Sequence, residues 1–234
     1  STVVLVCFAI QLMSIVQQLT RGVVDDMRWT WCIILSVKFG SAWTNWMLLT
    51  RATPFVVDPI TGRPNCMFRW AEWAVLAFVM AFVIDGTDSV SLRKPLSLGI
   101  LQGVSTTLGA CLPLATSGWT WVMMLATCIL LFSSIYARLF ARWRDLRKLQ
   151  NELSDNSYHL CKVRLATRLN ELTCFFWTLL AVFFVADVIA RVFSAYNPSV
   201  NWGFIAGCVI DVVAKLYYAD IVDTNLQYFP VRFR

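Results

Sequence analysis

The sequence predicts an all-α membrane protein, a bundle of seven transmembrane helices that forms a single domain over residues 1–234. Hydrophobic residues make up 58% of the chain and charged residues 15%, whereas a soluble domain of this length has fewer apolar and more charged residues. Windows of about 20 mainly apolar residues recur along the chain, and each is long enough to cross a bilayer. Basic residues gather in alternate connections between these windows. We therefore expect a multi-pass integral protein of the cell membrane, embedded in the lipid bilayer.

Seven apolar windows account for the predicted helices. They are residues 2–19, 30–50, 67–84, 96–115, 118–140, 171–194 and 201–223. Two of them, 2–19 and 96–115, contain no charged residue, as spanning helices usually do not. The window 30–50 contains Lys38 in its interior, and we assign this lysine no role at this point.

The distribution of arginine and lysine predicts the orientation. We place the N-terminus outside and, after seven crossings, the C-terminus inside. The inner connections and tail then hold 14 basic residues: Arg21, Arg28, Arg93, Lys94, Arg138, Arg142, Arg144, Arg147, Lys148, Lys162, Arg164, Arg168, Arg232 and Arg234. The outer side holds Arg51, Arg63 and Arg191, and this asymmetry follows the positive-inside rule. The net charge of +6 is therefore a topology signal, and no nucleic-acid partner is expected.

Cysteine usage argues against a metal centre or a disulfide framework. The eight cysteines are scattered and form no CxxC motif. Most of them fall inside the predicted helices, where cysteine behaves as a small hydrophobic residue. We expect no metal site.

Two opposite charges lie inside the last window. Asp211 and Lys215 are four residues apart in "CVIDVVAKLYY", so they share one helix face. A charge at the centre of a membrane helix costs about 2.5–3.5 kcal/mol on insertion scales, so such residues usually pair and serve a function. Glu72 lies about two turns from the outer end of the window 67–84, which runs the other way. We expect Glu72 and Asp211 to flank the Lys215 nitrogen from two helices, although a purely structural ion pair would show the same pattern.

A buried lysine with carboxylate neighbours suits Schiff-base chemistry, because the amine condenses with an aldehyde and the anions stabilise the protonated product. "DVVAK" with the following "LYYADIVDTN" resembles the seventh helix of the microbial (type 1) rhodopsins, bacteriorhodopsin among them. "RWAEW" at 69–73 resembles their third helix, which reads R-Y-x-D-W in many members. The seven helices, the topology and the order of the two motifs agree, so the resemblance covers essentially the whole chain.

The resemblance implies retinal as the cofactor, joined covalently to Lys215 as a Schiff base, with Glu72 and Asp211 as its counterions. Glu72 stands where the family has its main counterion and proton acceptor, with Glu in place of the commoner Asp. Arg69, one turn further out, would organise the carboxylates and nearby water. Two cations would then balance two anions, as an apolar site demands.

The resemblance also implies the walls of a retinal pocket, since a polyene gains mainly from dispersion and burial. The expected pocket residues are Trp73, Leu76, Gly109, Trp121, Met124, Trp177, Leu180 and Phe184. Trp73 and Trp177 match the family's tryptophans of helices 3 and 6, and Gly109 would make room for the ring of retinal. At Leu180, Ala181 and Phe184 the family often has Tyr, Pro and Trp, and this departure leaves the register of the sixth helix open.

The third helix departs from the pattern of the family's proton pumps. Those pumps carry a carboxylate acceptor, a threonine one turn on and a carboxylate donor about two turns further. Glu72, Leu76 and Val83 occupy these places here. An ionisable group is missing near Val83, so we do not expect an efficient outward proton pump. Glu72 argues against a sodium or chloride pump. We interpret Asp85 and Asp88, at the inner end of this helix, as solvated charges.

The connection "YARLFARWRDLRKLQNELSDNSYHLCKVRLATRLNEL" keeps a helical composition well beyond the membrane, with "SDNS" as the break. Apolar and basic residues alternate at helical spacing in "RLFARWRDLRKL". Such an extended pair of helices suits a lever or docking surface for an effector, as in sensory and effector-fused rhodopsins. A lipid-facing basic helix end accounts for the same pattern.

Our main hypothesis is a retinal-binding photoreceptor, not an enzyme, whose photoisomerisation sends a conformational signal to an effector on the inner side. That effector, such as an ion channel or a cyclase, would be fused after Arg234 or be a separate subunit, and bestrophin- or cyclase-coupled rhodopsins are the relatives to compare first. We also expect a homo-oligomer. The alternative is a light-gated ion channel or ion pump that acts by itself. A third reading is a transporter with a buried lysine–carboxylate site.

Overall fold

The computed structural model describes residues 2–22, 28–86, 93–153, 158–192 and 202–225. Within them the chain forms seven α-helices, one short 3₁₀ helix and one β-hairpin. The helices are α1 (Thr2–Arg21), α2 (Arg28–Leu49), α3 (Met67–Gly86), α4 (Arg93–Cys111), α5 (Gly118–Glu152), α6 (Tyr158–Val192) and α7 (Trp202–Thr224). The predicted fold class is confirmed, whereas the orientation of the termini stays a prediction.

The chain divides into two compact units, each of which is described by itself. Unit 1 consists of Ser1–Pro54 and Phe176–Arg234, and unit 2 consists of Phe55–Phe175. Helix α6 therefore contributes its first half to unit 2 and its second half to unit 1.

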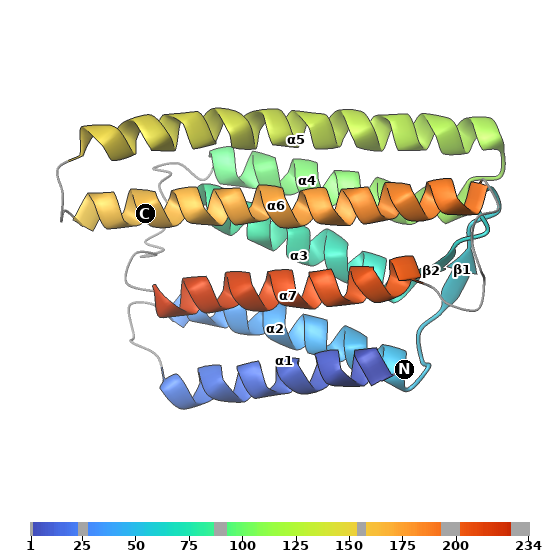
Figure 1. Ribbon diagram of the computed structural model, residues 1–234, viewed down its shortest axis with the longest axis horizontal. Coiled ribbons are helices and arrows are strands. Elements are labelled where there is room, and N and C mark those ends of the chain that lie inside the picture. The colour runs from blue at the N-terminus through green and yellow to red at the C-terminus, as the bar shows by residue number, and fades with distance from the viewer. Residues whose placement is uncertain (1, 23–27, 87–92, 154–157, 193–201, 226–234) are drawn as a thin grey trace. The chain divides into compact units, whose positions relative to one another are not determined.

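Unit 1 brings both ends of the sequence together. Helices α1, α2 and α7 pack against one another pairwise, as Figure 1 shows for the two blue helices and the red one. On α1 the buried positions are Val4, Cys7, Gln11, Ile15 and Gln18, which recur every three or four residues and so form one helix face. This face carries two glutamines among apolar residues, and it therefore presents polar groups to its neighbours.

Unit 2 contains α3, α4, α5, the first half of α6 and the hairpin. Helix α3 packs on α4, and α4 packs on α5. The hairpin pairs β1 (Phe55–Val57) with β2 (Pro64–Cys66) in antiparallel register, so that Val56 lies opposite Asn65. Its turn needs Gly62, whose φ of 65° is costly for any residue with a Cβ.

Two helices are longer than their apolar windows. Helices α5 and α6 each have 35 residues, and they extend into the connection that was expected to remain helical. Ser117 caps α5 by accepting a hydrogen bond from the Thr120 backbone nitrogen. The extension of α5 is rich in Leu, Arg, Lys and Gln, which are good helix formers. The predicted "SDNS" break lies outside the described residues.

Helix α4 ends earlier than predicted. The α-helix stops at Cys111, and Leu112–Leu114 continue as a 3₁₀ helix, so the expected end at residue 115 is wrong. Pro113 explains the change, because proline cannot donate the backbone hydrogen bond that would continue the α-helix. This short turn leads directly into the Ser117 cap of α5.

Six helices of the described residues are long and apolar enough to cross a membrane: Thr2–Arg21, Thr30–Leu49, Met67–Gly86, Arg93–Leu114, Gly118–Glu152 and Tyr158–Arg191. Helix α7 has 23 residues and sufficient length, but it carries Asp211, Lys215, Asp220 and Asp223. These charges make α7 harder to identify as a membrane helix from composition alone.

Candidate functional site

The core of the candidate site is an ion pair inside α7. The Lys215 Nζ lies 2.8 Å from Asp211 Oδ1 and 2.8 Å from Asp211 Oδ2. Each residue is only 4% exposed, so neither charge reaches water easily. Their spacing of four residues stacks the two side chains on one face of the helix. The structure thus brings together the two α7 residues that the sequence singled out.

A hydrogen-bonded chain of buried polar side chains continues from this pair into α2 and α1. Lys215 Nζ donates to Ser41 Oγ at 3.5 Å, and Gln11 Nε2 donates to the same oxygen at 2.6 Å. Asn45 Nδ2 in turn donates to Gln11 Oε1 at 2.7 Å. Gln11, Ser41 and Asn45 are at most 1% exposed. The three helices of unit 1 are therefore joined by a polar seam, which we define as Gln11, Ser41, Asn45, Asp211 and Lys215.

The sequence reasoning missed Gln11 as a member of this site. A signal existed, because Gln11 and Gln18 are seven residues apart and so lie on one face of a helix that has no charged residue before its last turn. Buried amides must find hydrogen-bond partners in a membrane interior. The two glutamines could have indicated a polar neighbour on another helix, although not which one.

Unit 2 holds a second buried pair of charges, on α3. Arg69 Nε lies 3.8 Å from Glu72 Oε2, and both residues are buried. The spacing of three residues places them on one face of the helix. The Glu72–Arg69 pair belongs to unit 2 and the Asp211–Lys215 pair to unit 1, so the expected approach of Glu72 to Lys215 remains a prediction.

The aromatic residues of α3 lie against α4. Trp73 and Trp70 meet edge to face, with ring centroids 5.2 Å apart. A Cβ added to Gly109 of α4 would lie 3.2 Å from Cζ3 of the Trp70 ring. The small residue at 109 thus makes room for a tryptophan of α3, and its expected role next to the ring of retinal stays a prediction.

Trp121 connects α5 to the hairpin. Its Nε1 donates to Asp58 Oδ2 at 2.8 Å, and both side chains are buried. The other carboxylate oxygen, Asp58 Oδ1, accepts from the backbone nitrogens of Ile60 and Thr61. The hairpin turn is therefore fixed to the first turn of α5. Neither the hairpin nor the role of Asp58 was predicted, although "DPITG" is a turn sequence between short β-prone segments.

The remaining expected pocket residues are divided between the units. Leu76 and Met124 lie in unit 2, where Leu76 is buried and Met124 half-buried. Trp177, Leu180 and Phe184 lie in unit 1, where Trp177 is buried and the other two are half-buried. Their shared contact with one ligand stays a prediction.

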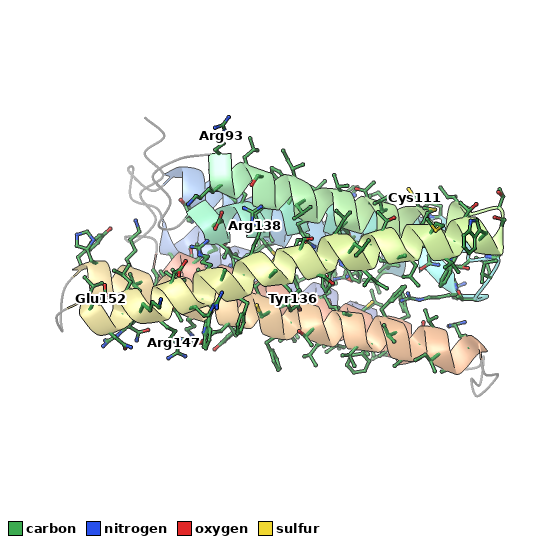
Figure 2. All side chains as sticks on the ribbon, turned by 90° about the horizontal axis from the view of Figure 1, so that it is seen from above. Arg93, Cys111, Tyr136, Arg138, Arg147 and Glu152 are labelled. Carbon is green, nitrogen blue, oxygen red and sulfur yellow. The ribbon has the colours of Figure 1, made fainter. Side chains whose placement is uncertain are left out.

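The second half of α5 is tied to the first half of α6 by side-chain hydrogen bonds. Tyr136 Oη donates to the Cys174 carbonyl at 3.1 Å, and Asn170 Nδ2 donates to the Leu139 carbonyl at 3.0 Å. Trp143 Nε1 and an Arg147 guanidinium nitrogen both donate to Glu171 Oε1. Figure 2 shows Tyr136 and Arg147 on the side of α5 that faces α6. We call these links the α5–α6 clasp.

Asp85, near the end of α3, corrects one expectation. It was interpreted as a solvated charge, but its carboxylate forms an ion pair with Arg142 of α5. The Asp85 side chain is 17% exposed, and the Arg142 side chain is 12% exposed. Because α5 stays helical beyond its apolar window, it brings Arg142 to the end of α3. The bare window 118–140 did not include this arginine.

Comparison with solved structures identifies the fold. No model of a known protein family matches the sequence, and neither does any curated protein. The crystal structure of a thermophilic rhodopsin from Rubrobacter xylanophilus matches with a TM-score of 0.74 at 15% identity, covering 98% of this chain and 96% of the other. Bromide-bound halorhodopsin from Halobacterium salinarum matches with a TM-score of 0.72 at 16% identity, covering 97% and 95%. The transmembrane domain and linker region of the Salpingoeca rosetta rhodopsin phosphodiesterase match with a TM-score of 0.73 at 17% identity, covering 94% and 67%.

The chain is thus a seven-helix membrane protein with a buried lysine–aspartate pair in its last helix. Its fold is that of the microbial (type 1) rhodopsins, as the two sequence motifs predicted.

Proposed function

We propose that the protein is a light-absorbing retinal protein in which Lys215 carries the chromophore. The observation that carries this proposal is the buried Lys215–Asp211 pair on the last helix of a microbial-rhodopsin fold. A lysine in an apolar interior is costly to maintain, and it is found mainly where its amine is needed. The fold alone does not show that retinal is attached. The support for attachment comes from the buried Lys215 amine and the Asp211 carboxylate beside it.

The residues of the site fit retinal. A primary amine held next to a carboxylate condenses with an aldehyde with loss of water, and the carboxylate stabilises a positive charge on the nitrogen. Bound in this way, retinal would supply visible absorption and a light-driven change of shape. The chain's own residues would hold the proton on the nitrogen, with Asp211 as the carboxylate at 2.8 Å and Ser41 as a nearby hydroxyl. Glu72 and Arg69 would complete a neutral set of charges.

We further propose that the absorbed light is used to signal to an effector on the side where α5 and α6 extend. The α5–α6 clasp supports this view, because its links hold two long helices together so that they would move as one lever. The buried positions Leu76 and Val83 support it as well, since they place no proton donor or acceptor on this part of α3. One similar structure comes from a rhodopsin phosphodiesterase, which offers a precedent for such a coupling.

One observation favours the alternative that the chain moves ions by itself. The polar seam gives unit 1 a hydrogen-bonded interior in helices that otherwise read as apolar. Illuminated vesicles that contain only this chain would separate the two functions. Signalling predicts no sustained photocurrent or pH change, whereas a pump or channel predicts one.

The test of the central proposal is an absorption spectrum of the purified protein with and without added retinal. We expect a visible band that hydroxylamine bleaches and that Lys215→Ala abolishes, because no other lysine is placed next to Asp211 among the described residues. Lys148→Ala, which changes an exposed lysine of α5, is the matched control and should keep the band. A colourless unmodified protein, or a band that survives in Lys215→Ala, would contradict the proposal.

A further inference from the structure

Lys38 of α2 is a second buried lysine, and the proposed function does not use it. Lys38 is 4% exposed, and its Nζ lies 3.5 Å from the backbone carbonyl of Ser14 on α1. Across the described part of the chain, this carbonyl is its only hydrogen-bond acceptor, and no carboxylate forms an ion pair with it. An unpaired cation in a membrane interior is expensive, and such residues mark sites of proton or ion movement.

Lys38 lies one helical turn from the candidate site. Ser41 is three residues further along α2, so the two buried side chains share a helix face. Ser41 Oγ accepts hydrogen bonds from Gln11 at 2.6 Å and from Lys215 at 3.5 Å. Its own hydroxyl proton is not used in any hydrogen bond within the described residues. Ser41 therefore offers an oxygen held in place by Gln11 and a proton that is free to be passed on.

Lys38 is also influenced by charged residues of α7 and α1, some of which are exposed at the surface. Asp223 and Asp220 of α7 and Arg21 of α1 are the charged groups that act on it. Arg21 lies 2.9 Å from Asp223 and 3.7 Å from Asp220. The Asp223 side chain is 5% exposed, whereas Arg21 is 42% and Asp220 58% exposed. The charged groups that act on Lys38 thus include one exposed carboxylate, Asp220, and one buried carboxylate, Asp223.

We propose that Lys38 is the proton donor to the Lys215 nitrogen, with Ser41 as the relay and the Asp220–Asp223 carboxylates as the route of recharging. This inference rests on the proposed function, in which Lys215 carries the chromophore, and it adds that the Lys215 nitrogen gives up its proton after light absorption. In the step, a proton leaves Lys38 Nζ for Ser41 Oγ while the hydroxyl proton of Ser41 moves to the Lys215 nitrogen. Lys38 is left as a neutral amine, and it then takes a proton from solution through Asp220 and Asp223. Lysine suits such a cycle because its charge is readily lost on burial, which arginine does not allow.

A proton donor on α2 would account for the apolar residues on α3. Leu76 and Val83 are buried and carry no titratable group, so α3 offers no donor at these positions. Lys38 supplies one from α2 instead, within a set of contacts that lies entirely in unit 1. The return of the proton would therefore depend on α1, α2 and α7.

The first test needs no retinal. The chain has five lysines, Lys38, Lys94, Lys148, Lys162 and Lys215, so the ζ-nitrogen NMR spectrum of ¹⁵N-lysine-labelled protein is sparse. The signal of Lys38 is assigned by its loss in Lys38→Arg. We expect it to change from ammonium to amine within the pH range in which the protein stays folded, and Asp223→Asn should move this change. A Lys38 that stays an ammonium throughout, or one that responds to added chloride and not to Asp223→Asn, would overturn the proposal and indicate a fixed charge or an anion site.

The second test uses the pigment and flash spectroscopy. Lys38→Met should slow the return of the visible band by about 100-fold, the usual contribution of a positioned proton donor. Lys38→Arg should slow it as well, which keeps the test valid if the methionine variant does not fold. Added azide, a small weak acid, should restore the rate in both variants, and the exposed control Lys148→Met should leave it unchanged. If the visible band returns at the unmodified rate in Lys38→Met, the donor role of Lys38 is refuted but the proposed function is not. If the unmodified protein shows no visible band at all, the proposed function is refuted.

Discussion

The stability of the protein depends on Lys215 and Asp211 both being present. A buried ion pair contributes little net stability, because desolvation offsets most of the attraction, but a single buried charge is strongly unfavourable. The same holds for the hydrogen bonds of the polar seam, in which each amide or hydroxyl would be left without a partner if its neighbour were removed. Single substitutions in this cluster should therefore destabilise the protein more than double ones do.

Asp211→Asn should lower the free energy of unfolding of the retinal-free protein by about 3–5 kcal/mol, because Lys215 would lose its carboxylate. Combining Asp211→Asn with Lys215→Met should recover most of this loss. Thermal unfolding followed by circular dichroism in detergent measures both. Asp220→Asn, at an exposed carboxylate of the same helix, is the control and should change little. Equal stability of the single variant and the unmodified protein would speak against a charged pair.

Glu72→Gln should move the visible band to longer wavelength and cause its loss at lower pH. Removing a carboxylate that is predicted to lie near the chromophore nitrogen would let the positive charge spread along the polyene and make the proton easier to lose. Spectra recorded over a pH series measure both effects, and Glu152→Gln at the exposed end of α5 is the control. An unchanged spectrum and titration would mean that Glu72 does not approach the Lys215 nitrogen.

At the level of elements, the start of α7 fits closely against the second half of α6. Asp187 of α6 is buried and pairs with Arg191 at 3.2 Å. A Cβ added to Gly203 of α7 would lie 2.6 Å from Asp187 Cγ and 2.8 Å from Oδ1, well inside contact distance. The absence of a side chain at 203 is therefore what lets α7 begin beside this buried carboxylate.

Gly203→Ala should lower the unfolding temperature, because the methyl group would displace a buried, ion-paired side chain. Gly207→Ala, one turn along the same helix, is the matched control, since nothing lies within 4 Å of its Cβ. There the change should be neutral or stabilising by up to about 1 kcal/mol, as alanine favours a helix more than glycine does. Differential scanning fluorimetry measures the unfolding temperatures of the two variants side by side. An unchanged unfolding temperature in Gly203→Ala would refute the close packing of α7 against Asp187.

The elements that the sequence predicted well are those with a strong apolar signal. The helices α1, α2, α3 and α7 begin and end within a few residues of their windows. Hydropathy alone could not place the ends of α5 and α6, because their extensions are polar and are held by the clasp and by helix propensity. The hairpin was not predicted because strands of three residues show almost no periodic pattern in the sequence.

For the whole molecule, the distribution of basic residues predicts an orientation in the membrane that can be measured. With 14 basic residues on one side and Arg51, Arg63 and Arg191 on the other, an N-terminal epitope should be accessible on intact cells. A C-terminal epitope should become accessible only after permeabilisation. Antibody labelling of cells that express each tagged form measures this. Surface labelling of the C-terminal tag on intact cells would reverse the topology.

The candidate site was predicted in part, and the reason lies in sequence distance. Asp211 and Lys215 are four residues apart, so helical geometry alone brings them together. Ser41 meets Lys215 across 174 residues of chain and Gln11 meets Ser41 across 30, and only the packing of α1, α2 and α7 shows it. Lys38 illustrates the same limit, since its sequence position places it inside an apolar window but does not show that it is buried or what lies beside it.

The seam in unit 1 also constrains how the protein is made. Gln11, Ser41 and Asn45 bond one another between α1 and α2, so these two helices can leave the translocation machinery as a pair whose amides are already matched. Helix α7 is synthesised last, and it brings an aspartate and a lysine that satisfy each other within a single turn. Each stage of synthesis thus exposes few unmatched polar groups to lipid. Within the seam, the link that has to wait for α7 is the hydrogen bond between Lys215 and Ser41.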